Sequence, residues 1–165
     1  MAGAKYHKKI IRALTWVAFV FYLAVLIYYL FFSDGFNRTM FSGEYRINLK
    51  PFYEIKRSWK LFFQDTHKYF HYFMINFVMN IVAFVPFGFM MPIIRPARKS
   101  FWWVLFYSLL LTVTVELMQL FLKAGTCDVD DILLNVCGGV AGYLFYVMGY
   151  AVYRRLFFGK AAGKK

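Results

Sequence analysis

One stretch of the chain, residues 114–142, places polar and acidic side chains inside otherwise apolar sequence. Two polar residues interrupt a first apolar run, three acids occupy the short connection after it, and one amide lies in the next run: Glu116, Gln119, Asp128, Asp130, Asp131 and Asn135. Ionisable and amide groups are strongly disfavoured in hydrocarbon unless they find partners. These residues are therefore the first candidates for a functional site.

The carboxyl groups indicate acid–base chemistry. Burial raises the pKa of a carboxyl group towards neutrality and makes it competent for proton transfer. Glu116 is therefore a catalytic candidate, together with Asp128 and Asp131. The alternative is a purely structural network between helices, in which Glu116 and Gln119 bond to Asn80 or Asn135 at about 0.6 kcal/mol for each bond.

The three aspartates also have the spacing of oxygen ligands for Mg²⁺ or Ca²⁺. Asp128, Asp130 and Asp131 are the candidate ligands, and a divalent cation is the cofactor that they suggest. The stretch lacks the length and the closing Glu of an EF-hand loop. Helix capping is the competing interpretation, because an Asp at the start of a helix accepts hydrogen bonds from its free N–H groups.

The composition excludes an ordinary soluble domain. Hydrophobic residues make up 61% of the 165 residues and aromatic residues 23%, and the mean hydropathy is +0.51. Such values are typical of a small polytopic membrane protein, and we expect a single domain over residues 1–165.

The apolar runs predict an all-α membrane protein with a bundle of four transmembrane helices, each long enough to cross a hydrocarbon core of about 30 Å. The expected helices cover residues 13–32, 73–94, 101–122 and 132–153. Four polar residues of the third helix recur on one face: Ser108, Thr112, Glu116 and Gln119.

The connection before the second helix carries a different pattern. Aromatic and basic residues in 52–71 recur on different faces of a helical wheel, which predicts an amphipathic helix lying in the membrane interface. The alternative is an aromatic-rich loop packed on the bundle.

The distribution of charge predicts the topology. Segments 1–12, 95–100 and 154–165 hold twelve Lys or Arg and no Asp or Glu. Cytoplasmic flanks carry such an excess, so both termini are expected in the cytoplasm and the 52–71 helix on the outer side. The net charge of +12 therefore reflects membrane anchoring, and we expect no nucleic-acid partner.

This orientation brings the polar residues of three helices to the outer leaflet. We expect the amides there to bind substrate: Asn76, Asn80, Gln119 and Asn135. With the aspartates above them, they would line one cavity that opens outward or sideways to lipid. The inner half of the predicted bundle contains almost nothing comparable.

Four blocks of the chain carry a resemblance to a known family. They are N-L-K-P-F (48–52), N-I-V-A-F-V-P-F-G-F-M-M-P (80–92), E-L-M-Q (116–119) and D-V-D-D-I-L-L-N-V-C-G-G-V-A-G-Y (128–143). In this order and spacing they resemble the VanZ-like membrane proteins. The resemblance implies a helical bundle in the plasma membrane and a role in resistance to glycopeptide antibiotics, chiefly teicoplanin. Many members carry an Arg shortly before the first of these aspartates, where this chain has Lys123.

Three functions follow as hypotheses. The first is binding or processing of a lipid-linked or amphiphilic molecule at the outer leaflet, with membrane lipids, a lipid-linked envelope precursor or a lipoglycopeptide as partners. The second is a membrane hydrolase or transferase that uses Glu116 and an aspartate-bound metal. The third is an assembly subunit whose polar residues only hold helices together.

Overall fold

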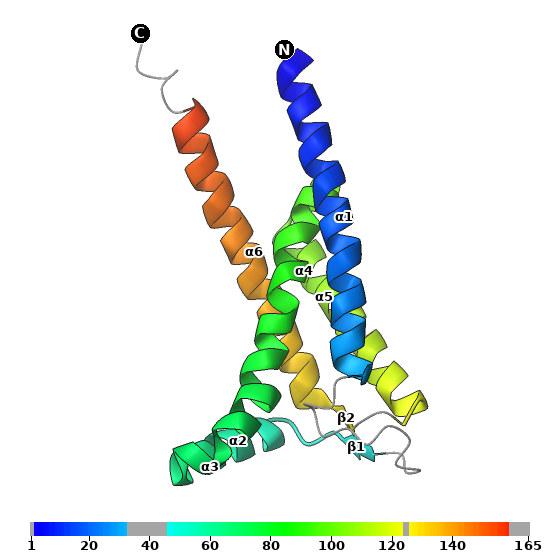
Figure 1. The fold of residues 1–165 in the computed structure, drawn as a ribbon, viewed down its shortest axis with the longest axis vertical. Helices are drawn as coiled ribbons and strands as arrows, with labels where there is room; N and C mark the ends of the chain where they lie inside the picture. The colour runs from blue at the N-terminus through cyan, green and yellow to red at the C-terminus, as the bar shows by residue number, and fades with distance from the viewer. Residues whose placement is uncertain (1, 33–45, 124–125, 159–165) are drawn as a thin grey trace.

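The computed structural model describes residues 2–32, 46–123 and 126–158, and Figure 1 shows their arrangement. The elements, in chain order, are α1 (Ala2–Phe32), β1 (Arg46–Asn48), α2 (Tyr53–Gln64), α3 (Thr66–Phe73), a π-helix (Met74–Met79), α4 (Asn80–Ile94), a 3-10 turn (Pro96–Arg98), α5 (Phe101–Phe121), β2 (Thr126–Asp128) and α6 (Val129–Phe158).

Within these residues, four helices are long and apolar enough to cross a membrane. The spans are Lys9–Phe31, Thr66–Ile94, Phe101–Phe121 and Val129–Leu156. The predicted four-helix membrane bundle is confirmed. Three spans exceed the predicted limits, because the predictions stopped at charged or polar residues and the helices continue through them.

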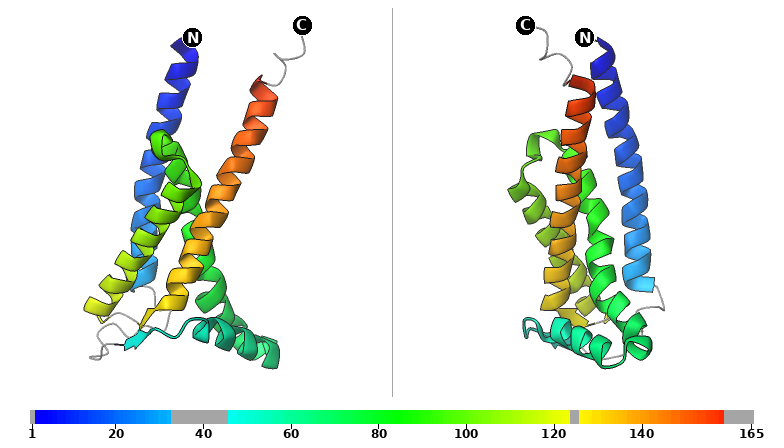
Figure 2. Two further views of the ribbon diagram at one scale, coloured as in Figure 1. Left: turned by 180° about the vertical axis from the view of Figure 1, so that it is seen from behind. Right: turned by 90° about the vertical axis from the view of Figure 1, so that its left-hand side faces the viewer.

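The two ends of the bundle differ in what they carry. The start of α1 and the end of α6 lie at one end, here called the terminal end (Figures 1 and 2). Helices α2 and α3 and both strands lie at the opposite end, here called the polar end.

Helices α4 and α6 pack backbone against backbone at glycines. A Cβ atom at Gly88 would overlap the carbonyl of Gly139, and one at Gly138 would overlap the carbonyl of Ile81. Small residues permit this close approach between membrane helices. Gly149, further along α6, has nothing within 4 Å of a Cβ position.

Helix α1 buries side chains against this core mainly in the half near the polar end. Leu26, Leu30 and Phe31 form the buried core cluster with Phe84 and Val115. Tyr22 also donates a hydrogen bond to the Ala83 carbonyl at 2.7 Å. The rest of α1 is largely exposed, as expected for a surface that faces lipid.

The prediction of one continuous helix over residues 52–71 is wrong in one respect, because the structure has two helices. Asp65 adopts an extended conformation between them, and its side chain accepts a hydrogen bond from the Lys68 N–H at 3.1 Å. This cap ends α2 and starts α3. The apolar face of α2 packs Trp59 and Phe62 against Phe73, with ring centroids 4.9 and 4.6 Å apart. Its place in the membrane interface stays a prediction.

Candidate functional site

Two short strands join the segments that carry the site. Strands β1 and β2 pair in parallel, with Asn48 opposite Asp128 and Ile47 opposite Cys127. No pattern in the sequence predicted this pairing. It holds the residues before α2 beside the start of α6, where the aspartates begin.

Asp128 ends β2 and lies directly before α6. One carboxylate oxygen accepts the Asn48 side-chain amide at 2.9 Å, and the other accepts the backbone N–H of Asp130 at 2.8 Å. The second bond is an N-cap of α6, so the predicted capping by an aspartate is confirmed. Burial raises the pKa of Asp128, although both hydrogen bonds act in the opposite direction.

Asp130 is fully buried and caps a different helix. Its carboxylate accepts the backbone N–H groups of Phe52, Glu54 and Ile55 at 2.5, 2.8 and 3.1 Å. Phe52, the N-cap residue of α2, has φ 62° and a side chain that cannot cap. Asp130 therefore supplies the cap from more than 70 residues away in the chain.

Glu116 connects α5 to this arrangement. Its side chain is 2% exposed, and its Oε2 accepts the backbone N–H of Asp128 at 3.0 Å. This hydrogen bond is one of its interactions. A buried carboxylate is thus placed next to the segment that caps both α2 and α6.

Asp131 joins the site to α4. The Asn80 side-chain amide donates to Asp131 Oδ1 at 2.5 Å and to the Asn76 carbonyl at 3.1 Å. Asn80 directly follows the π-helix, a form that often occurs at functional sites. Asn76 belongs to that π-helix, and its side chain donates to the Tyr72 carbonyl at 2.9 Å. The side-chain amide of Asn76 therefore bonds to a carbonyl group of its own helical segment, and the structure does not bring this amide to the other candidates.

Further along α5 and α6, two buried amides face neighbouring helices. Asn135 donates to Thr112 Oγ1 at 2.9 Å, and Gln119 donates to the Leu30 carbonyl of α1 at 3.4 Å. The predicted polar face of α5 is confirmed as buried, since Ser108, Thr112 and Gln119 are 0% exposed. In the described part of the chain, the amide oxygens of Gln119 and Asn135 accept no hydrogen bond.

Comparison with known proteins now identifies the family. The VanZ/LLP1 family model matches residues 19–153, which include every residue of the site. The chain belongs to the VanZ/LLP1 family. No curated protein and no solved structure matches it. With its four spans, the chain is thus a multi-pass membrane protein of a family associated with glycopeptide resistance.

The VanZ/LLP1 core brings most of the predicted site residues together. Hydrogen bonds link Glu116, Asp128 and Asp130 at the polar end, and a separate hydrogen bond links Asn80 to Asp131, the next residue in the chain. Asn135 and Gln119 lie on the same polar surface between α5 and its neighbours.

The three candidate metal ligands are directed to different partners. Asp130 binds the α2 amides, Asp128 binds Asn48 and the start of α6, and Asp131 binds Asn80. In residues 2–32, 46–123 and 126–158, no group of three His, Cys, Asp or Glu side chains has an arrangement that could hold a metal ion. A divalent cation at these aspartates stays a hypothesis.

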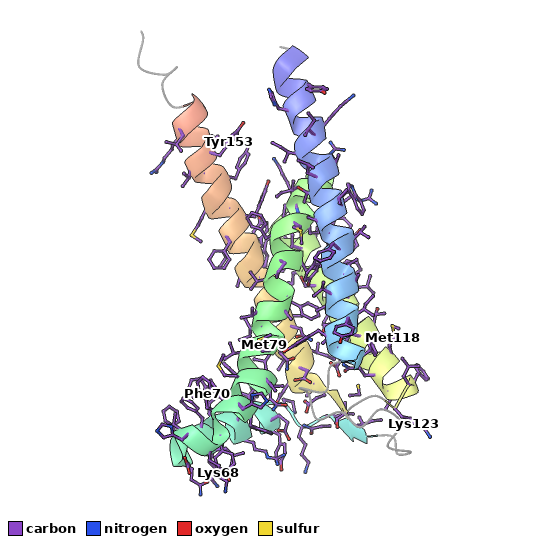
Figure 3. All side chains as sticks on the ribbon, viewed as in Figure 1. Lys68, Phe70, Met79, Met118, Lys123 and Tyr153 are labelled. Carbon is purple, nitrogen blue, oxygen red and sulfur yellow. The ribbon has the colours of Figure 1, made fainter. Side chains whose placement is uncertain are left out.

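Asn48 and Thr112 are two residues of the site for which no role was predicted. Both are hydrogen-bond partners of predicted site residues. Asn48 could have been found because it lies in the N-L-K-P-F block that resembles the family. Thr112 could have been found because it lies one helical turn from Glu116 on the same face. Lys123 follows α5 with φ 52°, at the opposite corner of the polar end from Lys68 of α3 (Figure 3).

Proposed function

We propose that this VanZ/LLP1 protein binds the polar headgroup of a lipid-linked or amphiphilic cell-envelope molecule at the polar end, and thereby contributes to resistance to glycopeptides such as teicoplanin. The excess of Lys and Arg in the segments at the terminal end supports an outward-facing polar end. The plasma membrane is the expected location, with both termini in the cytoplasm.

The observation that carries the proposal is the pair of unsatisfied amide oxygens. Gln119 Oε1 and Asn135 Oδ1 are buried and accept no hydrogen bond from the described residues. A network that only joins helices gains by satisfying every buried acceptor, because an unsatisfied one costs about 1–3 kcal/mol. Acceptors kept open at this cost suit a ligand that is rich in hydroxyl or N–H donors, such as a glycan or peptide headgroup.

A cationic groove on α2 supports an anionic component in the same ligand. A cavity of about 430 Å³ is lined by Tyr53, Lys56, Arg57 and Lys60. Asp130 holds the start of this helix against the polar end. Lys and Arg bind phosphate oxygens well, and lipid-linked envelope precursors carry phosphate between lipid and glycan.

The test replaces an unsatisfied acceptor by an apolar side chain of similar size. Gln119→Leu gives up one long hydrogen bond to Leu30, so stability should change by less than about 1 kcal/mol. Loss of the acceptor should lower the teicoplanin resistance that the protein confers on a susceptible host by about fivefold, the equivalent of one hydrogen bond to a ligand.

Thr114→Val is the matched control. Thr114 lies on the exposed face of α5 and donates only within its own helix, to the Leu110 carbonyl. Resistance should stay at the wild-type level in this variant, with equal amounts of protein in the membrane. Wild-type resistance in both Gln119→Leu and Asn135→Leu would contradict the proposal and favour a purely structural network.

An enzymatic role for the same residues is the second candidate. The specific observation in its favour is that the buried carboxylate of Glu116 accepts the backbone N–H of Asp128, a residue whose own carboxyl group is also buried. Such a pair suits proton transfer in a hydrolase or transferase. Turnover of a lipid-linked precursor by purified protein, abolished in Glu116→Gln, would establish this role over simple binding.

A further inference from the structure

A second cavity lies away from the polar end, between α1, α4 and α5. It measures about 450 Å³ and is lined by aromatic side chains, among them Trp16 and Phe19 of α1, Phe87 of α4 and Tyr107 of α5. The rings of Phe19 and Phe87 are in contact, with centroids 5.9 Å apart. The cavity therefore has apolar walls contributed by three membrane helices.

One cation stands at the rim of this cavity. Arg95 directly follows Ile94, the last residue of the second span, so its guanidinium lies at the depth of lipid headgroups. It is 5.9 Å from the centroid of the Trp16 ring, within the range of a cation–π contact.

The terminal end offers no acidic side chain as a partner for Arg95. In the described part of the chain Arg95 forms no ion pair, unlike Arg57, which pairs with Glu54. Residues 2–12, 95–100 and 154–158 lie towards the terminal end and contain no Asp or Glu. An anion held here is thus a bound molecule.

We propose that this cavity binds an anionic phospholipid of the leaflet at the terminal end, with its phosphate at Arg95 and the upper part of an acyl chain between the aromatic walls. Basic pockets between membrane helices bind anionic lipid headgroups in this way. A free phosphate would use the cation and leave the apolar walls empty, so the walls favour a lipid. The site is separate from the polar end and does not depend on the function proposed for it.

The experiment is native mass spectrometry of the full-length protein in detergent, titrated with phosphatidylglycerol, phosphatidylcholine or glycerol 3-phosphate. Wild-type protein should bind phosphatidylglycerol in preference to phosphatidylcholine. Arg95→Gln should weaken phosphatidylglycerol binding about fivefold, the effect of one basic residue at a lipid surface.

Lys99→Gln is the matched control because it removes the same charge from the same connection. The Lys99 ammonium lies over the Tyr150 ring of α6, 6.0 Å from its centroid, and does not line the cavity. It should leave lipid binding unchanged. Ala97→Trp fills the rim without changing charge and should also weaken binding, so it carries the test if Arg95→Gln does not fold.

The proposal is overturned if wild-type protein binds both lipids equally, or if Lys99→Gln loses as much affinity as Arg95→Gln. Binding of glycerol 3-phosphate as tight as that of phosphatidylglycerol would also overturn it, because the apolar walls would then contribute nothing.

Discussion

At the polar end, the carboxylates of Glu116, Asp128 and Asp130 accept hydrogen bonds that tie α5 to β2, β2 to β1, and α6 to α2. At the terminal end, α6 beyond Gly142 exposes its large apolar residues, and the described α1 residues before Phe19 are mostly exposed too. None of the buried polar residues in the described chain belongs to α1 or to α6 beyond Asn135. Buried polar side chains thus characterise the polar end, and exposed apolar side chains characterise the terminal end.

This difference matters because buried polar groups are an expensive way to hold membrane helices together. The close packing of α4 against α6 at glycines already joins these two helices without any polar side chain. The proposed binding of a headgroup would explain why carboxylates and amides are concentrated at one end.

The largest expected effect comes from the glycine contact between α4 and α6, which lies between the polar end and the terminal end. Gly88→Val places a Cβ against the Gly139 backbone, which cannot move aside as a side chain can. We expect destabilisation of about 3 kcal/mol or more and little folded protein after detergent extraction. Gly149→Val adds the same side chain where nothing lies within 4 Å and should leave the thermal midpoint almost unchanged. Equal loss in both variants would show that the contact is not tight.

Removing the Asp130 carboxylate, which caps α2 from α6, should have the next largest effect. Asp130→Ala leaves the N–H groups of Phe52, Glu54 and Ile55 without their acceptor. We expect a loss of about 2 kcal/mol and faster amide hydrogen exchange at residues 52–55.

Asp65→Ala provides the comparison, because Asp65 is an exposed cap with one hydrogen bond to Lys68. Its loss should cost about 1 kcal/mol and speed exchange only around α3. If Asp130→Ala leaves exchange at 52–55 unchanged, Asp130 does not hold α2.

The smallest effect concerns pH. Because burial raises the pKa of Asp128 in the folded state, the protonated form is favoured by folding. Its stabilising contribution is present below the unfolded pKa, near 3.8, and is lost as pH rises through the higher folded pKa. The thermal midpoint of Asp128→Asn should therefore fall less than that of the wild type as pH rises through this window. An identical pH dependence in the two proteins would contradict the shift.

The sequence was sufficient for the membrane bundle because long apolar runs have few alternatives to spanning helices. It was also sufficient for the polar face of α5, since Ser108, Thr112 and Glu116 recur at helical spacing and are all buried. The break at Asp65 was missed because amphipathic periodicity continues across it, and a capping Asp in mid-pattern is a weak signal.

The hydrogen-bond partners within the site could not be predicted from local sequence patterns. Asp130 meets α2, and Asn48 meets Asp128, across 75 or more residues, so these contacts depend on how the loops lie at the polar end. Asn76 was assigned to the site by its depth in the membrane, but its amide bonds to its own helix. Depth predicts which leaflet a residue occupies and does not predict its partner.

The most direct test of a functional polar end is the resistance conferred by Glu116→Gln, measured with the amount of protein and its thermal midpoint in detergent. Gln keeps a carbonyl oxygen that can accept the Asp128 N–H, so folding should be close to that of the wild type. We expect resistance to be lost while stability is kept, because the carboxylate itself is needed. Wild-type resistance, or a loss that only follows a loss of folded protein, would show that Glu116 serves the structure alone.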